Sequence, residues 1–354
     1  MKIVFESSLY TLDQLKDLLE NYPEADKLIQ FISDWQSGET SFRFYTSGST
    51  GTPKPIEISR QQIVASVEAT AKYLSLQKKF SVLLCLNPDF IASVMMVARC
   101  LIVDMDLIIQ RPTANPMKDI TESIDFAAFV PIQIYKMMEE GTLSKLSMIN
   151  RVIIGGAPLS GLAFDALSKI DTDIYQTYGM TETVSHIALM PVKGNFASAT
   201  FHILDEVLIE QDLNCCLRAK GAVTCDRWIQ TNDIIERINE NEFLWLGRYD
   251  HTINSGGIKI HPEQLEKELE NVLGQQLEYI ISWEKNERVG MACVLLIEND
   301  TLSEEGFKNV QKTILDKFSK YHVPKAVYSL AQFARTDSGK IKREETRLLH
   351  HELG

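Results

Sequence analysis

The N-terminal half of the chain alternates short apolar runs with amphipathic stretches. Apolar, β-rich runs occupy 82–86, 107–109, 126–130 and 152–154, and helix-like stretches such as Ile132 to Met138 lie between them. This alternation is typical of parallel strands joined by crossover helices. Ligands of such sheets bind beyond the carboxyl ends of the strands, so the loops after these runs are the first candidates for a functional site.

The pattern changes after residue 195. Short alternating strands with polar turns fill 195–246, which favours an antiparallel sheet or a small barrel. Farther on, His261-Pro262-Glu263 opens a helix with proline at its first position, and 304–321 reads as an amphipathic helix. We therefore expect an α/β protein. Its large N-terminal domain (1–249) combines mostly parallel sheets flanked by helices with a small β subdomain, and an α+β C-terminal domain (250–354) follows a boundary at about Asp250.

One loop carries a distinctive set of groups. The stretch from Tyr45 to Lys54 reads YTSGSTGTPK, so glycines let the backbone approach a ligand, hydroxyl and N–H groups donate hydrogen bonds, and Lys54 adds charge. Such groups suit the oxyanions of a polyphosphate, although the loop matches neither the P-loop nor the dinucleotide pattern. A flexible linker is the alternative. A predicted strand over 41–46 and a capping box from Ser59 to Gln62 favour a positioned loop.

Composition excludes several classes of function. The length of 354 residues suggests two or three domains, and the 45% hydrophobic and 24% charged residues are ordinary for a globular protein. A net charge of −12 opposes a large nucleic-acid footprint. Charged residues interrupt the apolar region 82–109, which excludes a membrane span, and the first ten residues lack a secretory signal. Six cysteines without metal-binding spacing suit reduced thiols, so we expect a cytoplasmic protein.

Five further motifs follow in order along the chain. They are GGAP at 155–158, YGMTET at 178–183, TND at 231–233, GRYDHTINSGGIKIHPEQLE at 247–266 and TDSGKIKR at 336–343. Together with the loop at 45–55, they resemble the acyl- and aryl-CoA synthetases of the adenylate-forming superfamily, which also includes luciferases and the adenylation domains of peptide synthetases. The matching motifs cover nearly the whole chain.

The resemblance implies an enzyme that uses ATP to turn a carboxylate into an acyl-adenylate and then transfers the acyl group to coenzyme A. Within the superfamily, LNPDFIASVMMVARCL, TETVSHIA and GRYDHTINSGGIKI are most similar to o-succinylbenzoate–CoA ligases of menaquinone biosynthesis. ATP, Mg²⁺ and coenzyme A as co-substrate are therefore the implied cofactors. Because the phosphate loop begins at residue 45, the resemblance also implies a shortened N-terminal domain.

The resemblance also assigns roles to individual residues. The nucleotide contacts fall on Thr46, Ser47, Gly48, Ser49, Thr50, Gly51, Lys54, Gly155, Gly156, Ala157, Tyr178, Asp233 and Arg248. Thr181 would contact the α-phosphate, Glu182 would hold Mg²⁺ and Lys340 would promote adenylation. Gly256 and Gly257 would line the path of the thiol, and the mobile C-terminal domain would turn about a hinge at Asp250.

Each of these residues, taken alone, has a plainer interpretation. In that interpretation Lys54 and Lys340 would be solvated lysines, and Glu182 would be an acid at a helix N-terminus. Tyr178 would be a core residue, and Asp233 would belong to a turn. The agreement of several motifs, rather than any one of them, favours the functional interpretation.

The implied acid has two carboxylates, of which only one is activated. Arg99, Ser185 and His186 are our candidates for recognising the other. Arg99 pairing within its own helix and His186 as an interior histidine are the alternatives. A histidine or aromatic residue common in relatives before this helix is absent here, and Asn87 or Phe90 could take its place as a gate.

The expected partners are a small carboxylic acid, ATP and coenzyme A, with no nucleic acid and no membrane insertion. The sequence leaves open whether the chain forms a homodimer.

The sequence also leaves two other functions open. One is an adenylating enzyme that delivers its acyl group to a carrier protein, which the lack of a recognisable carrier domain disfavours. The other is a catalytically silent nucleotide-binding protein, which is disfavoured by the presence of Lys54, Glu182, Asp233, Arg248 and Lys340.

Overall fold

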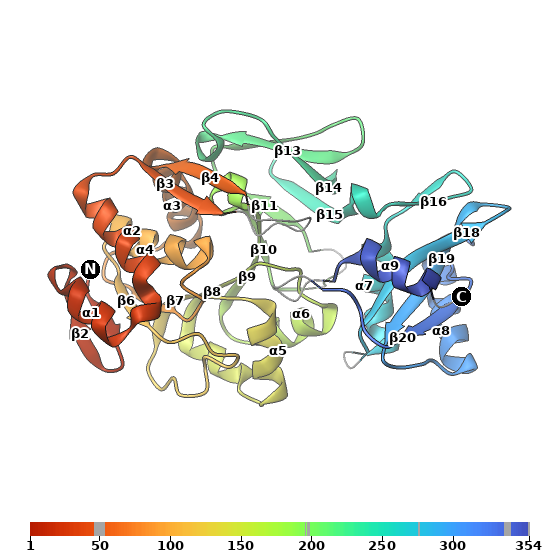
Figure 1. Cartoon of the computed structure of the whole chain (residues 1–354), viewed down its shortest axis with the longest axis horizontal. Helices are drawn as coiled ribbons and strands as arrows, with labels where there is room; N and C mark the ends of the chain where they lie inside the picture. Colours follow the sequence, from red (N-terminus) through yellow and green to blue (C-terminus); the bar gives the residue numbers. More distant parts are fainter. Residues whose placement is uncertain (46–53, 195, 197–198, 275–276, 336–340, 353–354) are drawn as a thin grey trace.

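The computed structural model describes residues 1–45, 54–194, 196, 199–274, 277–335 and 341–352 (Figure 1). Within these residues the strands form a 13-stranded sheet, a 5-stranded sheet and a two-stranded hairpin. The order in the large sheet is β12 (Val207–Gln211), β13 (Cys216–Gly221), β14 (Ile229–Arg237), β15 (Glu242–Arg248), β11 (Phe201–Ile203), β10 (His186–Pro191), β9 (Asp173–Gly179), β8 (Ile149–Ile154), β7 (Ile124–Phe129), β5 (Ser81–Leu84), β6 (Asp106–Ile109), β1 (Ile3–Phe5) and β2 (Ser8–Tyr10).

The strands from β9 through β8, β7, β5 and β6 to β1 are parallel, which confirms the main prediction from the sequence. Both faces of this part of the sheet are covered. Val82 and Leu84 point into a core cluster shared with the helices on one face, whereas Leu83 and Cys85 point into a second cluster on the other. Continuous apolar runs such as 82–86 arise because alternate side chains are buried on opposite faces.

Helices from the N-terminal third cover one face, and later helices cover the other (Figure 1). The first group is α1 (Leu15–Asn21), α2 (Asp26–Ser37), α3 (Arg60–Leu74) and α4 (Ile91–Val103), and the second is α5 (Pro131–Glu139) and α6 (Gly161–Leu167). Short 3₁₀ helices are η1 (Leu12–Gln14), η2 (Pro23–Ala25), η3 (Leu143–Met148), η4 (Thr181–Thr183), η6 (Ala222–Thr224) and η7 (Tyr249–His251).

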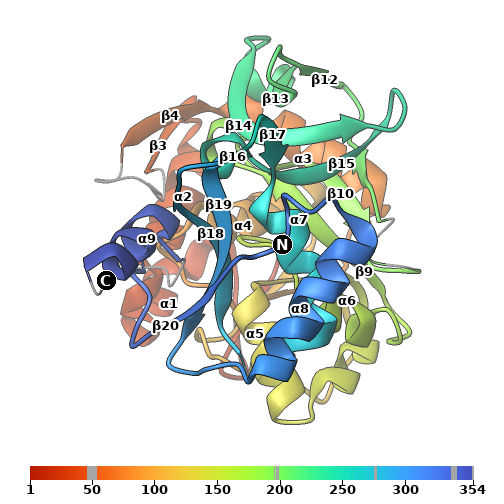
Figure 2. The same cartoon turned by 90° about the vertical axis from the view of Figure 1, so that its right-hand side faces the viewer.

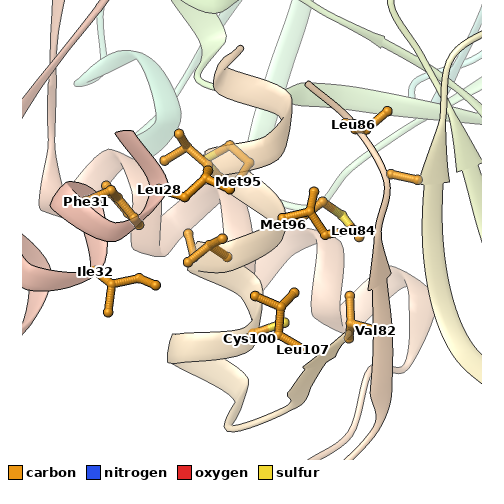
Figure 3. Close-up of a cluster of buried hydrophobic side chains, with 14 of the residues drawn as sticks. Leu28, Phe31, Ile32, Val82, Leu84, Leu86, Met95, Met96, Cys100 and Leu107 are labelled. Atoms are coloured by element: carbon orange, nitrogen blue, oxygen red, sulfur yellow. The ribbon is translucent and has the colours of Figure 1, made fainter. Parts of the chain in front are cut away.

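Helix α4 is enclosed between α2 and the sheet. Figure 3 shows Leu28 and Phe31 of α2 on one side of α4, and Leu84 and Val82 of β5 on the other. Every residue of α4 from 93 to 100 is buried. Each fully buried aliphatic side chain contributes about 1.5–3 kcal/mol, so this apolar packing fixes α4 firmly. Any polar side chain on α4 is consequently held in a low-dielectric interior.

The strands after residue 185 are antiparallel, as the sequence predicts for 195–246. They extend the large sheet rather than closing a separate barrel. The hairpin of β3 (Ser41–Tyr45) and β4 (Pro55–Ser59) brackets the glycine-rich loop. The predicted capping box is present, because the Ser59 side chain accepts from the Gln62 N–H at 3.2 Å and begins α3. No helix in these described ranges is long and apolar enough to cross a bilayer.

The C-terminal part has its own sheet and core clusters. Its elements are β16 (Ile253–Ser255), β17 (Ile258–Ile260), α7 (Pro262–Leu273), β18 (Tyr279–Asn286), β19 (Gly290–Glu298), α8 (Glu304–Lys317), β20 (Val327–Leu330) and α9 (Arg343–Glu352). Helix α8 is shorter than predicted, because the backbone becomes extended at Phe318 and turns between Ser319 and His322. The large sheet ends at Arg248 and this sheet begins at Ile253, while the division into two folding units at Asp250 remains a prediction.

Helix α7 joins the C-terminal part to the large sheet. In Figure 1 it lies on the side that faces α6, and Figure 2 shows the C-terminal strands and α8 in front of the large sheet. The Gly161 N–H at the start of α6 donates to the Glu270 carboxylate of α7. The Lys267 Nζ donates to the Phe196 carbonyl at 2.9 Å and lies 4.0 Å from the centre of the Phe196 ring. In this conformation these contacts hold α7 against the N-terminal part.

Candidate active site

Two predicted site loops lie side by side where β8 and β9 end. The Gly155 N–H donates to the Phe129 carbonyl at 3.0 Å, which keeps the loop against the sheet. A Cβ atom on Gly155 would lie 2.4 Å from the Thr177 Oγ1, and Gly156 has a φ of +91°. Both positions therefore require glycine. The result is a bare backbone, followed by the partly exposed Ala157, beside the strand that carries Tyr178.

Tyr178 belongs to a polar network that joins β9, β14 and β15. Its hydroxyl donates to the Asp233 Oδ2 at 2.7 Å. The Arg248 Nη1 lies 3.7 Å from the Asp233 Oδ1, because Asp233 and Arg248 are paired across the two strands. The structure thus brings together three residues that the sequence analysis assigned to nucleotide binding, although they lie up to 70 positions apart in the chain (248 − 178 = 70).

Trp245 completes this network and was missed in the sequence analysis. Its Nε1 donates to the Asp233 Oδ1 at 3.3 Å. Strict alternation would place Trp245 and Arg248 on opposite faces of β15, because they are three residues apart. A register shift between the pairs Ile234–Gly247 and Ile235–Trp245 inserts one extra residue and returns Trp245 to the face of Arg248. A bulge of this kind leaves no clear signal in the sequence.

The charged and titratable side chains of this network interact with one another. Burial, and then the negative charge of Asp233, raise the pKa of Tyr178 well above its ordinary value, so the phenol stays a hydrogen-bond donor. Arg248 donates from Nε and Nη2 to the two oxygens of Asp250 at 3.0 and 3.1 Å. Burial alone would raise the pKa of Asp250, but the bonds from Arg248 outweigh it and lower that pKa. Arg248 therefore links the Asp233 carboxylate to the predicted hinge.

The loop after β9 is a tight structure that carries Thr181 and Glu182. It folds back on the strand so closely that a Cβ on Gly179 would lie 2.3 Å from the Ser185 carbonyl oxygen. Val184 has φ +68° and ψ −54°, and the Ser185 N–H donates to the Thr183 carbonyl at 2.7 Å. This is a γ-turn with positive φ, which is rare and costs about 1–3 kcal/mol for a β-branched residue.

Buried groups hold this strained turn in place. The Thr183 Oγ1 accepts from the Met180 N–H at 3.0 Å and lies 2.8 Å from the Ser185 carbonyl oxygen. Thr183 is fully buried, and the Val184 side chain packs in the core that α4 shares. The path of the backbone between Gly179 and His186 is therefore fixed, and with it the positions of Thr181 and Glu182.

The donor set of this loop fits Mg²⁺. Over the part of the chain that the structure describes, the Glu182 carboxylate has neither a hydrogen-bond nor an ion-pair partner, and no three metal-ligating side chains cluster. Mg²⁺ is commonly bound by one or two carboxylates together with phosphate oxygens rather than by a protein cage. A single partly exposed carboxylate beside the Thr181 hydroxyl suits that mode of binding.

The three candidates for recognising a second carboxylate also come together. The Arg99 Nη2 donates to the Ser185 Oγ at 3.0 Å, and the Ser185 Oγ lies 3.4 Å from the His186 Nδ1. Within its own helix Arg99 reaches only the Met96 Sδ, at 3.7 Å. Helix α4 has no acidic side chain, so the alternative in which Arg99 forms a salt bridge within its own helix does not occur.

Several other predicted site residues are separate from this cluster. Gly256 and Gly257, with φ of +59° and +84°, form the two-residue turn between β16 and β17, where a Cβ on Gly256 would lie 2.9 Å from Tyr321. Asn87 accepts from the Asp89 N–H within its own turn, and Phe90 is 52% exposed. Lys54 is exposed just before β4. The predicted residues Thr46, Ser47, Gly48, Ser49, Thr50, Gly51 and Lys340 lie outside the described residues.

The chain is similar to known proteins over most of its length. Residues 6–206, more than half of the chain, match the family model of AMP-binding enzymes. The chain is 26% identical to a 2-succinylbenzoate–CoA ligase of Listeria monocytogenes over 91% of its own length and 72% of the relative. A protein of that name from Bacillus cytotoxicus is 25% identical over 97% and 76% of the two chains.

Solved structures have the same fold. A crystal structure described as an AMP-forming acyl-CoA synthetase/AMP-acid ligase II-like protein, from Dyadobacter fermentans, is 36% identical and covers 93% of this chain and 95% of that one, with a TM-score of 0.63. The o-succinylbenzoate CoA synthetase of Bacillus subtilis, bound to its acyl-adenylate intermediate, is 20% identical over 86% and 68% of the two chains, with a TM-score of 0.71. On the family match and the resemblance to the Dyadobacter protein, the chain belongs to the family of AMP-binding enzymes.

Proposed function

We propose that this chain is an AMP-forming carboxylate–CoA ligase and that its acid is 2-succinylbenzoate. Family membership and the Listeria and Bacillus relatives support the reaction class and the acid. The observation that carries the proposal is the Tyr178–Asp233–Arg248 network at the strand ends, beside the Thr181–Glu182 loop. It sets a partly buried carboxylate against Tyr178, whose neighbour Thr177 lies against the bare Gly155 backbone, and this arrangement suits a nucleoside.

The reaction has two steps. In the first, a carboxylate oxygen attacks the α-phosphorus of ATP, the bond from that phosphorus to the bridging oxygen breaks, and pyrophosphate leaves with the electron pair. In the second, the sulfur of coenzyme A attacks the acyl carbon, AMP leaves, and the thiol proton goes to solvent or a base. The first step exchanges a very poor leaving group for a phosphate ester, so catalysis is mainly positioning and neutralisation of charge.

The network around Asp233 suits the ribose. The Asp233 side chain is 14% exposed and accepts from Tyr178 and Trp245. A carboxylate offers about four lone-pair sites, so acceptor capacity remains for two vicinal hydroxyls. The Gly155-Gly156 backbone would approach the base. Tyr178, whose ring packs edge-on against Phe243 at 5.3 Å, would set the width of that pocket.

The loop after β9 suits the phosphates. Glu182 would hold Mg²⁺, which neutralises charge on the phosphate oxygens when it is bound. The Thr181 hydroxyl would donate to the α-phosphate, and the buried Thr183 keeps both residues in position. The glycine-rich loop with Lys54 would bind the outer phosphates, and Lys340 would stabilise the charge that develops during adenylation. The C-terminal domain would turn about Asp250 between the two steps.

Acid-dependent exchange of labelled pyrophosphate into ATP tests this function. We expect exchange with 2-succinylbenzoate in a panel of carboxylic acids, and an acyl-CoA thioester plus AMP when coenzyme A is added. Asp233→Ala should lower exchange at limiting ATP, whereas Asp226→Ala, an exposed matched control, should not. Exchange without a thioester would favour a carrier-protein acceptor. ATP binding without exchange for any acid would contradict the proposal and favour a silent nucleotide-binding protein.

A further inference from the structure

Helix α7 presents one polar face to the N-terminal part of the chain. Glu263, Lys267 and Glu270 are four and three residues apart, so their side chains lie on the same side of the helix. Leu265 and Leu269 are fully buried in the C-terminal core. Helix α7 packs against both β15 and α6, and Figure 2 shows it between them. The polar face of α7 therefore meets the strands and loops that carry the candidate nucleotide site.

Glu263 lies in the first turn of α7 and contacts the end of β15. A Cβ atom on Gly247 would lie 2.5 Å from the Glu263 Oε2 and 3.5 Å from the Glu263 Cβ, so the side chain lies directly against that glycine. Gly247 is paired with Ile234, and the next pair along the two strands is Arg248 with Asp233. Glu263 thus contacts, from the C-terminal part, the backbone that carries the two groups assigned to the ribose.

The other oxygen of Glu263 binds the segment predicted to be the hinge. The Glu263 Oε1 is hydrogen-bonded to the Nδ1 of His251, which follows Asp250. Burial alone would raise the pKa of Glu263, but the bond from His251 and the charge of Arg343 outweigh it and lower that pKa. The carboxylate is therefore ionised at neutral pH and can only accept, so His251 donates from Nδ1.

A third contact connects Glu263 to the segment that follows Lys340. The Arg343 Nε lies 3.9 Å from the Glu263 Oε1, and Arg343 begins α9, three positions after Lys340. The Glu263 side chain is 12% exposed, and its Oε2 has no hydrogen-bond partner among the described residues. A buried carboxylate oxygen without a donor is costly, so stability alone would favour an apolar side chain at this position.

We propose that Glu263 is a positioning residue for the adenylation step. It would hold three segments in one arrangement: the end of β15, the hinge and the start of α9. Glu263 itself would not touch the substrates. This inference rests on the proposed two-step reaction, in which the C-terminal domain turns about Asp250 after adenylation. Gly247 precedes the hinge and Glu263 follows it, so that turn would break their contact. The contact would therefore serve the first step and not the second.

Separate assays of the two half-reactions test this role. Acid-dependent exchange of labelled pyrophosphate into ATP reports the first, and thioester formation from coenzyme A and ready-made 2-succinylbenzoyl-adenylate reports the second. We expect Glu263→Ala to lower the kcat of exchange about 10- to 100-fold, as for loss of hydrogen bonds to a charged group. Thioester formation should change by less than about twofold, because no contact made in that step is lost.

A matched control comes from the same helix. Glu268→Gln removes the charge of a carboxylate that pairs with Lys317 of α8, within the C-terminal part, and it should leave both half-reactions unchanged. Glu263→Gln keeps an oxygen that can accept from His251, and it should recover part of the exchange lost in Glu263→Ala.

His251→Ala tests the same contact from its other side. It removes the donor that orients Glu263, so it should reproduce the selective loss of exchange. The double variant should lose no more than Glu263→Ala alone, because both substitutions act on one interaction. If Glu263→Ala does not fold, His251→Ala decides, because the His251 side chain is 26% exposed and its loss leaves the core unchanged.

The outcomes distinguish this inference from the proposed function. An equal loss in both half-reactions, or an unchanged rate of exchange, would overturn the role of Glu263 and leave the ligase reaction standing. A selective loss of thioester formation would also overturn it, because Glu263 would then serve the second step. If the wild-type protein shows no exchange with any acid, the proposed function and this inference both fail.

Discussion

The Glu270 carboxylate gives the contact between α7 and α6 a dependence on pH. It accepts from the Gly161 N–H at the start of α6. Burial, the largest influence, raises the pKa of Glu270 to about 7. The hydrogen bond from Gly161 and the ammonium of Lys267 lower it, whereas the carboxylates of Glu266 and Asp165 raise it further. The contact therefore favours the protonated side chain.

The size and sign of the effect follow from linkage. The pKa rises from an ordinary 4.5 to about 7, a difference of about 2.5 units, and each unit corresponds to about 1.36 kcal/mol. Burial of the ionised form therefore costs about 3 kcal/mol at pH 8. Because the folded state binds the proton more tightly, stability is lost as pH rises from about 4.5 and the loss levels off above about 7.

Glu270→Gln removes the charge and keeps an oxygen that can accept from Gly161. We expect the variant to be more stable than the wild type at pH 8, with the difference growing by about 2 kcal/mol between pH 5 and pH 8. Urea unfolding followed by circular dichroism at several pH values measures it. Glu305→Gln, on the exposed side of α8, makes the same charge change and should show no such growth. A constant difference at all pH values, or a variant less stable at pH 8, would refute the reasoning.

Three further changes probe the candidate site and its support. Thr183→Val keeps the shape but leaves the Met180 N–H without its acceptor, so we expect a loss of about 1–3 kcal/mol in unfolding experiments and weaker pyrophosphate exchange; unchanged exchange would show that the turn does not position the loop. Tyr178→Phe removes the donor to Asp233 and keeps the ring packing, so KM for ATP should rise about tenfold with little change in melting temperature. An unaltered KM would argue against nucleotide binding there. Ser59→Ala removes the cap of α3 and should cost about 1 kcal/mol without changing KM for the acid, as thermal melts and steady-state kinetics would show.

Much of the fold is predictable because hydrophobic periodicity reflects burial directly. The runs at 82–86 and 152–154 are parallel strands covered on both faces, and the capping box at Ser59 begins a helix where the sequence places it. The motifs predict that Asp233 and Arg248 belong to one site. The structure brings the carboxylate and the guanidinium together because the two residues are paired on adjacent strands.

The remaining features depend on contacts between distant positions or on irregular backbone. Arg99 meets Ser185 across 86 positions, and Gly161 meets Glu270 across 109, so neither contact leaves a local pattern. Trp245 reaches Asp233 only because of a bulge. The positive φ of Val184 contradicts its residue preference and is imposed by the surrounding packing.

The most direct test of the central claim follows the oxygen atoms of the acid. The protein is incubated with ATP, Mg²⁺, coenzyme A and 2-succinylbenzoate labelled with ¹⁸O in its carboxylates, and the AMP is examined by mass spectrometry. Formation of an acyl-adenylate predicts one ¹⁸O atom in the phosphate of each AMP, with one acyl-CoA formed for each AMP. Unlabelled AMP, or ADP in place of AMP, would contradict the account.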